Sequence, residues 1–357
     1  MMEVKNSYTP CLRTGDDIKT VMFDVILALT PAILISILVY GLSSFLIILI
    51  CILSAVLTET IFSKIFFNEI SSIKNLSAIV TGILLAFILA PYTPIYVAAF
   101  GAAMAIIFGK LIFGGIGKNR LNPAVVGREF MTVFFPLIMS SPAIWSGNSL
   151  NISELKIFSF IIDNNLTNYL DKLLINPTGS IGEVSILALI AGGTYLLIKN
   201  RISWHIPVAL FCTVFLVSSF VKEAEISMGG LMLVGIFMAT DTPTSPTYSF
   251  GKFYYGMMMG LTMAIFWKFG IQSETLSYSI IVLNIFSKKI NKVFRPVVSG
   301  YKLNLIKKIF SFLKISILIF LFDLLWILLH KFDIIPYIVF IYILVTTVKL
   351  ISSKNIK

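Results

Sequence analysis

Hydrophobic runs separated by short polar segments fill most of the 357-residue chain. Twelve runs are apolar enough to cross a membrane, although several are shorter than the ~20 residues that a complete helical span needs. The short runs predict helices that break inside the membrane. The twelve runs cover residues 21–41, 43–63, 77–91, 93–113, 124–140, 180–198, 206–221, 227–240, 253–269, 277–287, 309–330 and 335–352.

Two polar segments rich in glycine or proline stand out, because each interrupts a hydrophobic stretch. The first signature is GGIGKNRLNP at 114–123, and the second is MATDTPTSP at 238–246. Irregular backbone at membrane depth is tolerated only where it packs against protein or lines a wet cavity. The two signatures therefore indicate transport or cofactor binding.

Composition agrees with a polytopic membrane protein. Hydrophobic residues make up 57% of the chain, charged residues make up 13%, and the mean hydropathy is +0.95, which excludes an ordinary soluble domain. The net charge is +11, but the basic residues stand in short loops between apolar runs. They are read as topology signals that place both termini in the cytoplasm, and not as a nucleic-acid patch. The three widely separated cysteines favour neither a disulfide framework nor a metal site.

Five predicted spans precede the long loop at 141–178, and five follow it before a basic stretch. An odd number of spans inverts the second half relative to the first, as in many transporters. We therefore expect an all-α polytopic fold with about ten core helices in two inverted five-helix repeats, plus a C-terminal hairpin. The expected segments are a cytoplasmic N-terminus, a first repeat, an extracytoplasmic loop, a second repeat, a basic cytoplasmic loop and the hairpin with its tail, at 1–20, 21–140, 141–178, 179–290, 291–308 and 309–357.

The first signature ends in a helix start. Asn122 and Pro123 form a good cap and first-turn pair for the apolar run that follows. The free N–H groups of such a helix start can hold a phosphate or another anion. The alternative is a re-entrant turn that only closes the fold. Positive charge is available nearby from Lys118, Arg120 and Arg128.

The second signature gathers oxygen ligands. Asp241 is accompanied by Thr240, Thr242, Thr244 and Ser245, with two prolines interleaved. Hydroxyl and carboxylate oxygens suit a hard cation or the polar edge of a flavin. A solvated turn that uses Asp and Pro is the alternative interpretation.

Three carboxylates are candidates for an ion path because ionisable groups inside a membrane are costly and usually functional. They are Asp24, Glu129 and Glu183. For Asp24 and Glu183, a role at a helix start is the alternative. A fourth carboxylate, Asp323, lies deep in the C-terminal hairpin and can pair with either Lys314 or His330, and the sequence does not choose between them.

Four motifs, in order along the chain, resemble the RnfD/NqrB family, which contains the D subunit of the Rnf ion-translocating complex and the B subunit of the sodium-translocating NADH:quinone reductase. The resemblance covers roughly residues 8–296, and the length favours the Rnf D subunit. The motifs are DVILALTPA at 24–32, GGIGKNRLNPAVVGREF at 114–130, GSIGEVSILALIAGG at 179–193 and FMATDTPTSP at 237–246.

The resemblance implies a urea-transporter-like fold in the bacterial cytoplasmic (inner) membrane. It further implies a complex in which electrons pass between ferredoxin and NAD while Na⁺ or H⁺ crosses the bilayer. The implied partners are a soluble-facing subunit linked to ferredoxin or NAD and membrane subunits that carry flavin or iron–sulfur centres. The chain is then a translocase component that is not catalytic alone. The resemblance implies FMN as a cofactor, and riboflavin as a second flavin.

Family members carry FMN on a threonine in a motif like DxxSGAT, and the corresponding string here is AIWSGNSL at 143–150. Ser149 stands in the place of the acceptor threonine, so one reading is FMN bound covalently to its hydroxyl. FMN held without a bond and stacked on Trp145, or no FMN, are the other readings. The cofactor-binding candidates are Ser149, Ser146, Gly147, Trp145, Asn122, Asp241, Thr240 and Ser245.

Two rival functions rest on the same features. The inverted repeat and broken helices also suit a channel or secondary transporter for a small polar solute. The altered flavin motif suits a component of the same complex that has lost its cofactor and serves as a scaffold.

Overall fold

The computed structural model describes residues 17–66, 75–145, 173–175, 179–218, 220–221, 227–296 and 305–354. Every regular element in these ranges is helical, as the sequence predicted. Together with shorter apolar helices, four long ones make a multi-pass membrane protein. The helices long and apolar enough to cross a bilayer are Ile18–Tyr40, Leu42–Phe66, Ile95–Phe113 and Lys308–Lys331.

The helices of the first half follow the predicted runs closely. A glycine makes the tight turn between the first two, because Gly41 has a φ of 63° and donates its N–H to the carbonyl of Ile37 at 2.8 Å. The fourth run is an α-helix that ends in a 3₁₀ turn. The elements are α1 (Ile18–Tyr40), α2 (Leu42–Phe66), α3 (Ser77–Phe87), α4 (Ile95–Gly109), η2 (Leu111–Phe113), α5 (Pro123–Phe134), α6 (Pro136–Met139) and η3 (Pro142–Ile144).

The second half repeats this pattern of long and interrupted helices. Its third helix begins as an α-helix and widens into a π-helical turn just before the second signature. The elements are η4 (Ile181–Glu183), α8 (Ile186–Ile198), α9 (His205–Ser218), α10 (Met228–Leu233), η5 (Val234–Met238), α11 (Ser249–Lys268) and α12 (Thr275–Phe294).

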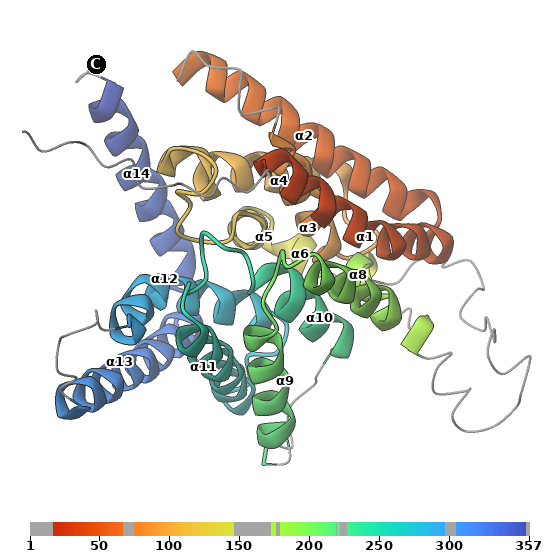
Figure 1. The fold of residues 1–357 in the computed structure, drawn as a ribbon. Coiled ribbons are helices and arrows are strands. Elements are labelled where there is room, and N and C mark those ends of the chain that lie inside the picture. Colours follow the sequence, from red (N-terminus) through yellow and green to blue (C-terminus); the bar gives the residue numbers. More distant parts are fainter. Residues whose placement is uncertain are drawn as a thin grey trace, which may run out of the picture.

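Each half contains one helix that packs against two others of the same half. In the first half α4 packs against α2 and α5, and in the second half α11 packs against α9 and α12. The first helices of the halves, α1 and α8, pack against each other, and the last ones, α5 and α12, are also in contact. Figure 1 shows the short helices α3, α5 and α10 near the middle of the molecule, with α2 and α14 at its edge.

The predicted C-terminal hairpin is a pair of helices that meet at a short turn and then diverge, and together they cover one side of this core (Figure 1). It consists of α13 (Leu305–Lys331) and α14 (Ile335–Lys354). Helix α13 packs on α11 and α12, whereas α14 packs on α5 and η2 (Figure 1). The hydroxyl of Tyr342 donates to the carbonyl of Phe108 at 2.8 Å. The hairpin therefore contacts both halves of the chain.

The crossing of α1 and α8 depends on Gly192. A Cβ atom at this position would lie 2.1 Å from the carbonyl oxygen of Ala28. We expect Gly192→Ala to destabilise the protein by about 1–3 kcal/mol because the helices must separate. Gly251→Ala is the control, since its Cβ would meet nothing closer than 3.4 Å. Thermal unfolding in detergent, followed by tryptophan fluorescence, measures both, and equal midpoints would contradict the close crossing.

Candidate cofactor and ion-translocation site

The two signatures meet in the folded chain. Asn122 is the N-cap of α5, where its side-chain oxygen accepts from the N–H of Ala124 at 3.0 Å and Pro123 takes the first helical position. The predicted cap is thus confirmed. The side-chain amide of Asn122 also donates to the carbonyl of Met238 at 3.4 Å. This bond joins the end of the first signature to the start of the second.

A cavity opens where the signatures meet, and we call it the signature cavity. Its polar lining includes Asn119, Asn122, Thr240 and Asp241. Three of the predicted cofactor-binding residues, Asn122, Thr240 and Asp241, therefore lie together. The fourth residue from the signatures, Ser245, is buried and lines a neighbouring hollow with Thr240.

Asp241 belongs to a turn that holds its carboxylate in place. The hydroxyl of Thr244 donates to its Oδ2 at 3.1 Å, and the N–H of Ser245 donates to its carbonyl at 2.9 Å. Asp241 therefore presents a carboxylate in a fixed position beside the signature cavity.

Lys110 lines the same cavity but is not the loop cation that the sequence suggested. Its side chain is 3% exposed, and its ammonium group donates to both oxygens of Glu59, at 2.8 and 2.7 Å. It also donates to the hydroxyl of Ser77. The pair ties α2, α3 and the end of α4 together.

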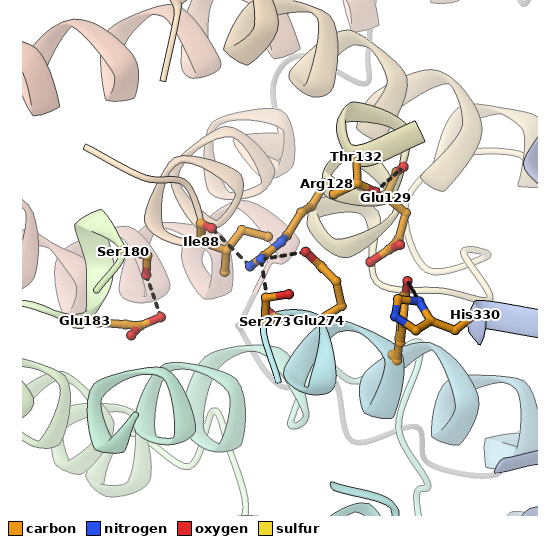
Figure 2. A network of polar contacts seen from close by, with 10 residues as sticks. Ile88, Arg128, Glu129, Thr132, Ser180, Glu183, Ser273, Glu274 and His330 are labelled. Carbon is orange, nitrogen blue, oxygen red and sulfur yellow. Dashed lines mark hydrogen bonds and ion pairs between the residues drawn. The ribbon is translucent and has the colours of Figure 1, made fainter. Parts of the chain in front are cut away.

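Arg128 lies apart from the anion site predicted at the start of α5. It stands more than one turn into the helix, and its guanidinium group points toward the start of α12 (Figure 2). It donates to the carbonyl of Ile88 at 3.2 Å, to the carbonyl of Ser273 at 3.4 Å and to the carboxylate of Glu274 at 3.3 Å. Its buried Nε has no hydrogen-bond partner in the described part of the chain.

A second cavity surrounds Arg128, and we call it the arginine cavity. Its walls include Trp145, Glu183, Ser227 and Trp267. The cavity thus combines a cation, a carboxylate and two indole rings. None of the residues of the two signatures lines it.

Glu183 is held by hydroxyl groups and by closely packed glycines. Ser180 donates to its Oε1 at 2.7 Å (Figure 2), and Ser227 donates to its other oxygen. A Cβ atom at Gly229 would lie 2.4 Å from the carbonyl oxygen of Glu183. The start of α10 can therefore approach this carboxylate only because a glycine stands there.

Trp145 is the last described residue before residue 173, and it lines the arginine cavity. Its indole is 45% exposed, and the preceding carbonyl, of Ile144, accepts from the N–H of Tyr92 at 3.1 Å. The candidates Ser146, Gly147 and Ser149 lie outside the described residues.

Asp24 lies in neither cavity. Arg201 donates to its Oδ2 at 2.7 Å and the hydroxyl of Tyr195 donates to its Oδ1 at 2.9 Å. The residue stands well inside α1, whose N-cap is Asp17. The helix-start interpretation of Asp24 is therefore wrong, and in this structure the carboxylate joins α1 to α8 and the turn after it.

The two residues suggested as partners of Asp323 are not its partners. The hydroxyl of Thr262 on α11 donates to its Oδ2 at 3.0 Å. His330 instead makes a hydrogen bond of 3.2 Å between its Nδ1 and the hydroxyl of Tyr278. No ion pair links Lys314 to Asp323 in the described residues.

The two cavities approach each other along α5. Ala124 lines the signature cavity and Arg128 lines the arginine cavity, and four residues of α-helix rise about 6 Å. A narrow gap between them is lined mainly by apolar side chains, among them Val125, Leu233 and Met238. Roughly one helical turn of apolar packing therefore separates the two polar cavities.

Comparison with known proteins identifies the group to which this arrangement belongs. The model of the NQR2, RnfD, RnfE family matches residues 5–300. The chain belongs to this family. The match includes both signatures and both cavities, and it ends before α13.

Individual relatives agree with the family. The chain is 33% identical to the D subunit of the Na⁺-translocating ferredoxin:NAD⁺ oxidoreductase complex of Acetobacterium woodii, over 82% of this chain and 94% of that protein. It is 31% identical to the D subunit of the proton-translocating ferredoxin:NAD⁺ oxidoreductase complex of Clostridium ljungdahlii, over 82% of this chain and 95% of that protein. The B subunit of a Na⁺-translocating NADH-quinone reductase of Ectopseudomonas mendocina is 31% identical over 58% of this chain and 55% of its own length.

Several members of the site are not evident from the sequence. Glu274 follows a polar turn and has no motif around it, yet it is the acidic partner of Arg128. Tyr278 and His330 are 52 residues apart and belong to different helices. A signal was available for His330, because Ser316, Asp323 and His330 are polar residues spaced by seven along an apolar helix.

Proposed function

We propose that the chain is the D subunit of an Rnf-type membrane complex that couples electron transfer between ferredoxin and NAD to the translocation of Na⁺ or H⁺. The observation that carries this proposal is the pair of polar cavities separated by a thin apolar layer, beside the loop in which the family bears FMN. Membership in the family supports it. The partners would be the other subunits of that complex.

The corresponding contacts in the two halves support an inverted repeat. Two halves related by a pseudo-two-fold axis bring their first helices together and their last helices together, and α1 with α8 and α5 with α12 are such pairs. In transporters of this architecture the ion crosses at the interface between repeats. Both cavities are lined by residues from both halves of the chain, as an inverted repeat would require.

The residues of the arginine cavity fit a flavin. Arg128 has an unused buried N–H that can donate to a phosphate, and Trp145 offers an exposed indole face for stacking. Ser149 belongs to the same string of the sequence as Trp145. A bound flavin would supply a group that accepts and passes on electrons.

The chain's own residues would bind the flavin and the ion, and they would keep the two cavities apart. Arg128 would hold an anionic group, and Glu274 would keep the guanidinium group oriented. Asp241 would accept the cation, or its proton, in the signature cavity. The apolar layer around Val125 would prevent the ion from leaking across when no electron moves. Opposite charges ~4 Å apart attract by about 4 kcal/mol at an intermediate dielectric, which is enough to bias the occupancy of an ion site.

The first test is the flavin content of the complex that contains this chain, expressed with its own flavin transferase. Intact and peptide mass spectrometry, together with in-gel flavin fluorescence, would detect FMN on the peptide that contains Ser149. We expect Ser149→Ala to remove the modification, because the hydroxyl that forms the phosphoester is lost. Ser153→Ala, outside the string at 143–150, is the matched control and should keep it.

The outcomes separate the rival functions. Flavin that is released only on denaturation, with no modified peptide, would support a carrier held without a bond in the arginine cavity. A native complex without flavin on this chain would contradict the redox role. Flux of a small polar solute through the purified chain would then favour a channel, and full complex activity without flavin here would favour a scaffold.

A further inference from the structure

The hairpin that lies beyond the family match is joined to the core by a stripe of polar residues on α13. Ser316, Asp323 and His330 recur every seven residues and face α11 and α12. Each bonds to a core side chain that bears a hydroxyl, and those partners are Tyr254, Thr262 and Tyr278 in the same order. Residues seven apart lie on one face of a helix. The stripe fixes the register of the hairpin and leaves His330 at its end.

A buried carboxylate of the core points toward His330. Glu129 on α5 is 6% exposed, and its Oε1 has no hydrogen-bond partner in the described ranges. Figure 2 shows its side chain pointing from α5 toward His330 on α13. A buried carboxylate without a partner is costly unless it binds a cation or a proton. The hairpin therefore brings a titratable ring to an unsatisfied acid.

The other side of His330 leads to the surface. The ring stands in the last turn of α13 and is partly exposed. The residues Lys331, Phe332 and Asp333, which follow it, are exposed. The hydroxyl of Tyr278, which bonds to the ring, is flanked by Glu129 and Arg128 from α5 and by Glu274 from α12, and Lys331 and Asp333 stand beside His330 in its own segment.

We infer that His330 passes protons between the buried Glu129 carboxyl and water at the end of α13, while Tyr278 orients the ring. This inference rests on the proposed function and makes the translocated ion a proton. Imidazole is the side-chain group that exchanges protons most readily near neutral pH. One water, or a rotation of the Glu129 side chain, completes the contact between the two groups.

The proton balance is simple. Glu129 loses a proton as its carboxyl becomes a carboxylate, and the neutral ring of His330 gains it and becomes imidazolium. The imidazolium then releases a proton to surface water and returns to the neutral ring. The Glu129 carboxylate then regains a proton from water on the side of the protein opposite to the end of α13. No electron moves in these steps.

The test uses the whole complex in inverted membrane vesicles. A pH-sensitive dye measures proton uptake driven by ferredoxin oxidation in sodium-free buffer, and NAD reduction is measured with a protonophore present. We expect His330→Gln, which can keep a hydrogen bond to Tyr278 but cannot gain a proton, to lower proton uptake per electron at least about tenfold. NAD reduction in the presence of the protonophore should stay within about twofold of the wild-type rate, because Arg128 and the string at 143–150 are unchanged. Asp323→Asn, on the same stripe, is the matched control and should pump normally.

Two further variants separate proton transfer from structure. Glu129→Gln should give the same loss, and the double variant should be no worse than either single one, because both act in one path. External imidazole should restore proton uptake in His330→Ala. If His330 had only a structural role, imidazole would not restore it.

Normal proton uptake by His330→Gln would overturn the inference. So would wild-type vesicles that take up radioactive sodium and no protons, although the proposed function would survive that result. A complex that reduces no NAD from ferredoxin would overturn both.

Discussion

Lys110→Met is expected to destabilise the protein more than any other single substitution considered, by about 3–5 kcal/mol, because it leaves a charge buried without its partner. Glu59 is 1% exposed, and Lys110 supplies its ion pair at 2.7 Å. Thermal unfolding of the purified chain in detergent measures the loss. Lys64→Met is the matched control, since Lys64 is an exposed lysine on the same helix as Glu59, and it should change little.

The double variant Glu59→Leu/Lys110→Met tests the cause. Replacing both members of a buried ion pair by apolar groups is often neutral or stabilising. We therefore expect most of the stability to return. A double variant as unstable as Lys110→Met would show that the lysine acts through other contacts, of which the bond to Ser77 is the first candidate.

Arg128→Gln is expected to have the largest effect on activity. The substitution removes the cation that faces Glu274 and the only arginine of the arginine cavity among its described lining residues. We expect flavin retention and electron transfer by the assembled complex to fall at least about tenfold, which corresponds to ~1.4 kcal/mol. Flavin fluorescence after gel filtration and ferredoxin-dependent NAD reduction measure the two quantities.

Two comparison variants separate function from folding in this case. Arg128→Lys keeps the charge but cannot bond to Ile88 and Glu274 together as a planar fork does, so we expect an intermediate defect. Arg128→Gln/Glu274→Gln removes the unpaired acid and should recover stability without recovering activity. If activity returned with stability, Arg128 would be a structural residue only.

The helices were predictable because their signal is local. Each apolar run became a helix, and Asn122 with Pro123 marked the start of α5 correctly because capping depends on neighbouring residues. The sequence also predicted that some helices would be interrupted, since runs such as 227–240 are too short to span a bilayer. The π-helical turn of η5 was not predictable from local sequence; in the fold it packs against α8 and α9.

The partners of the polar residues were much less predictable. Arg128 was expected to add its charge to the first signature, but a position on a helix does not tell which cavity a long side chain enters. Asp24 was expected on an ion path or at a helix start, and it pairs with Arg201, which is 177 residues away. Such pairs depend on how helices cross. The sequence carries no local trace of that geometry.

The hairpin has a consequence for how the protein is made. Helices α13 and α14 leave the ribosome after all the core helices, yet α14 covers α5 and η2 from the first half. Its bond from Tyr342 to Phe108 spans 234 residues. Contacts this distant in sequence form late and slowly. Until synthesis reaches α14, one wall of the first half faces lipid or the insertion machinery, so a prematurely terminated chain would present that bare wall to membrane proteases.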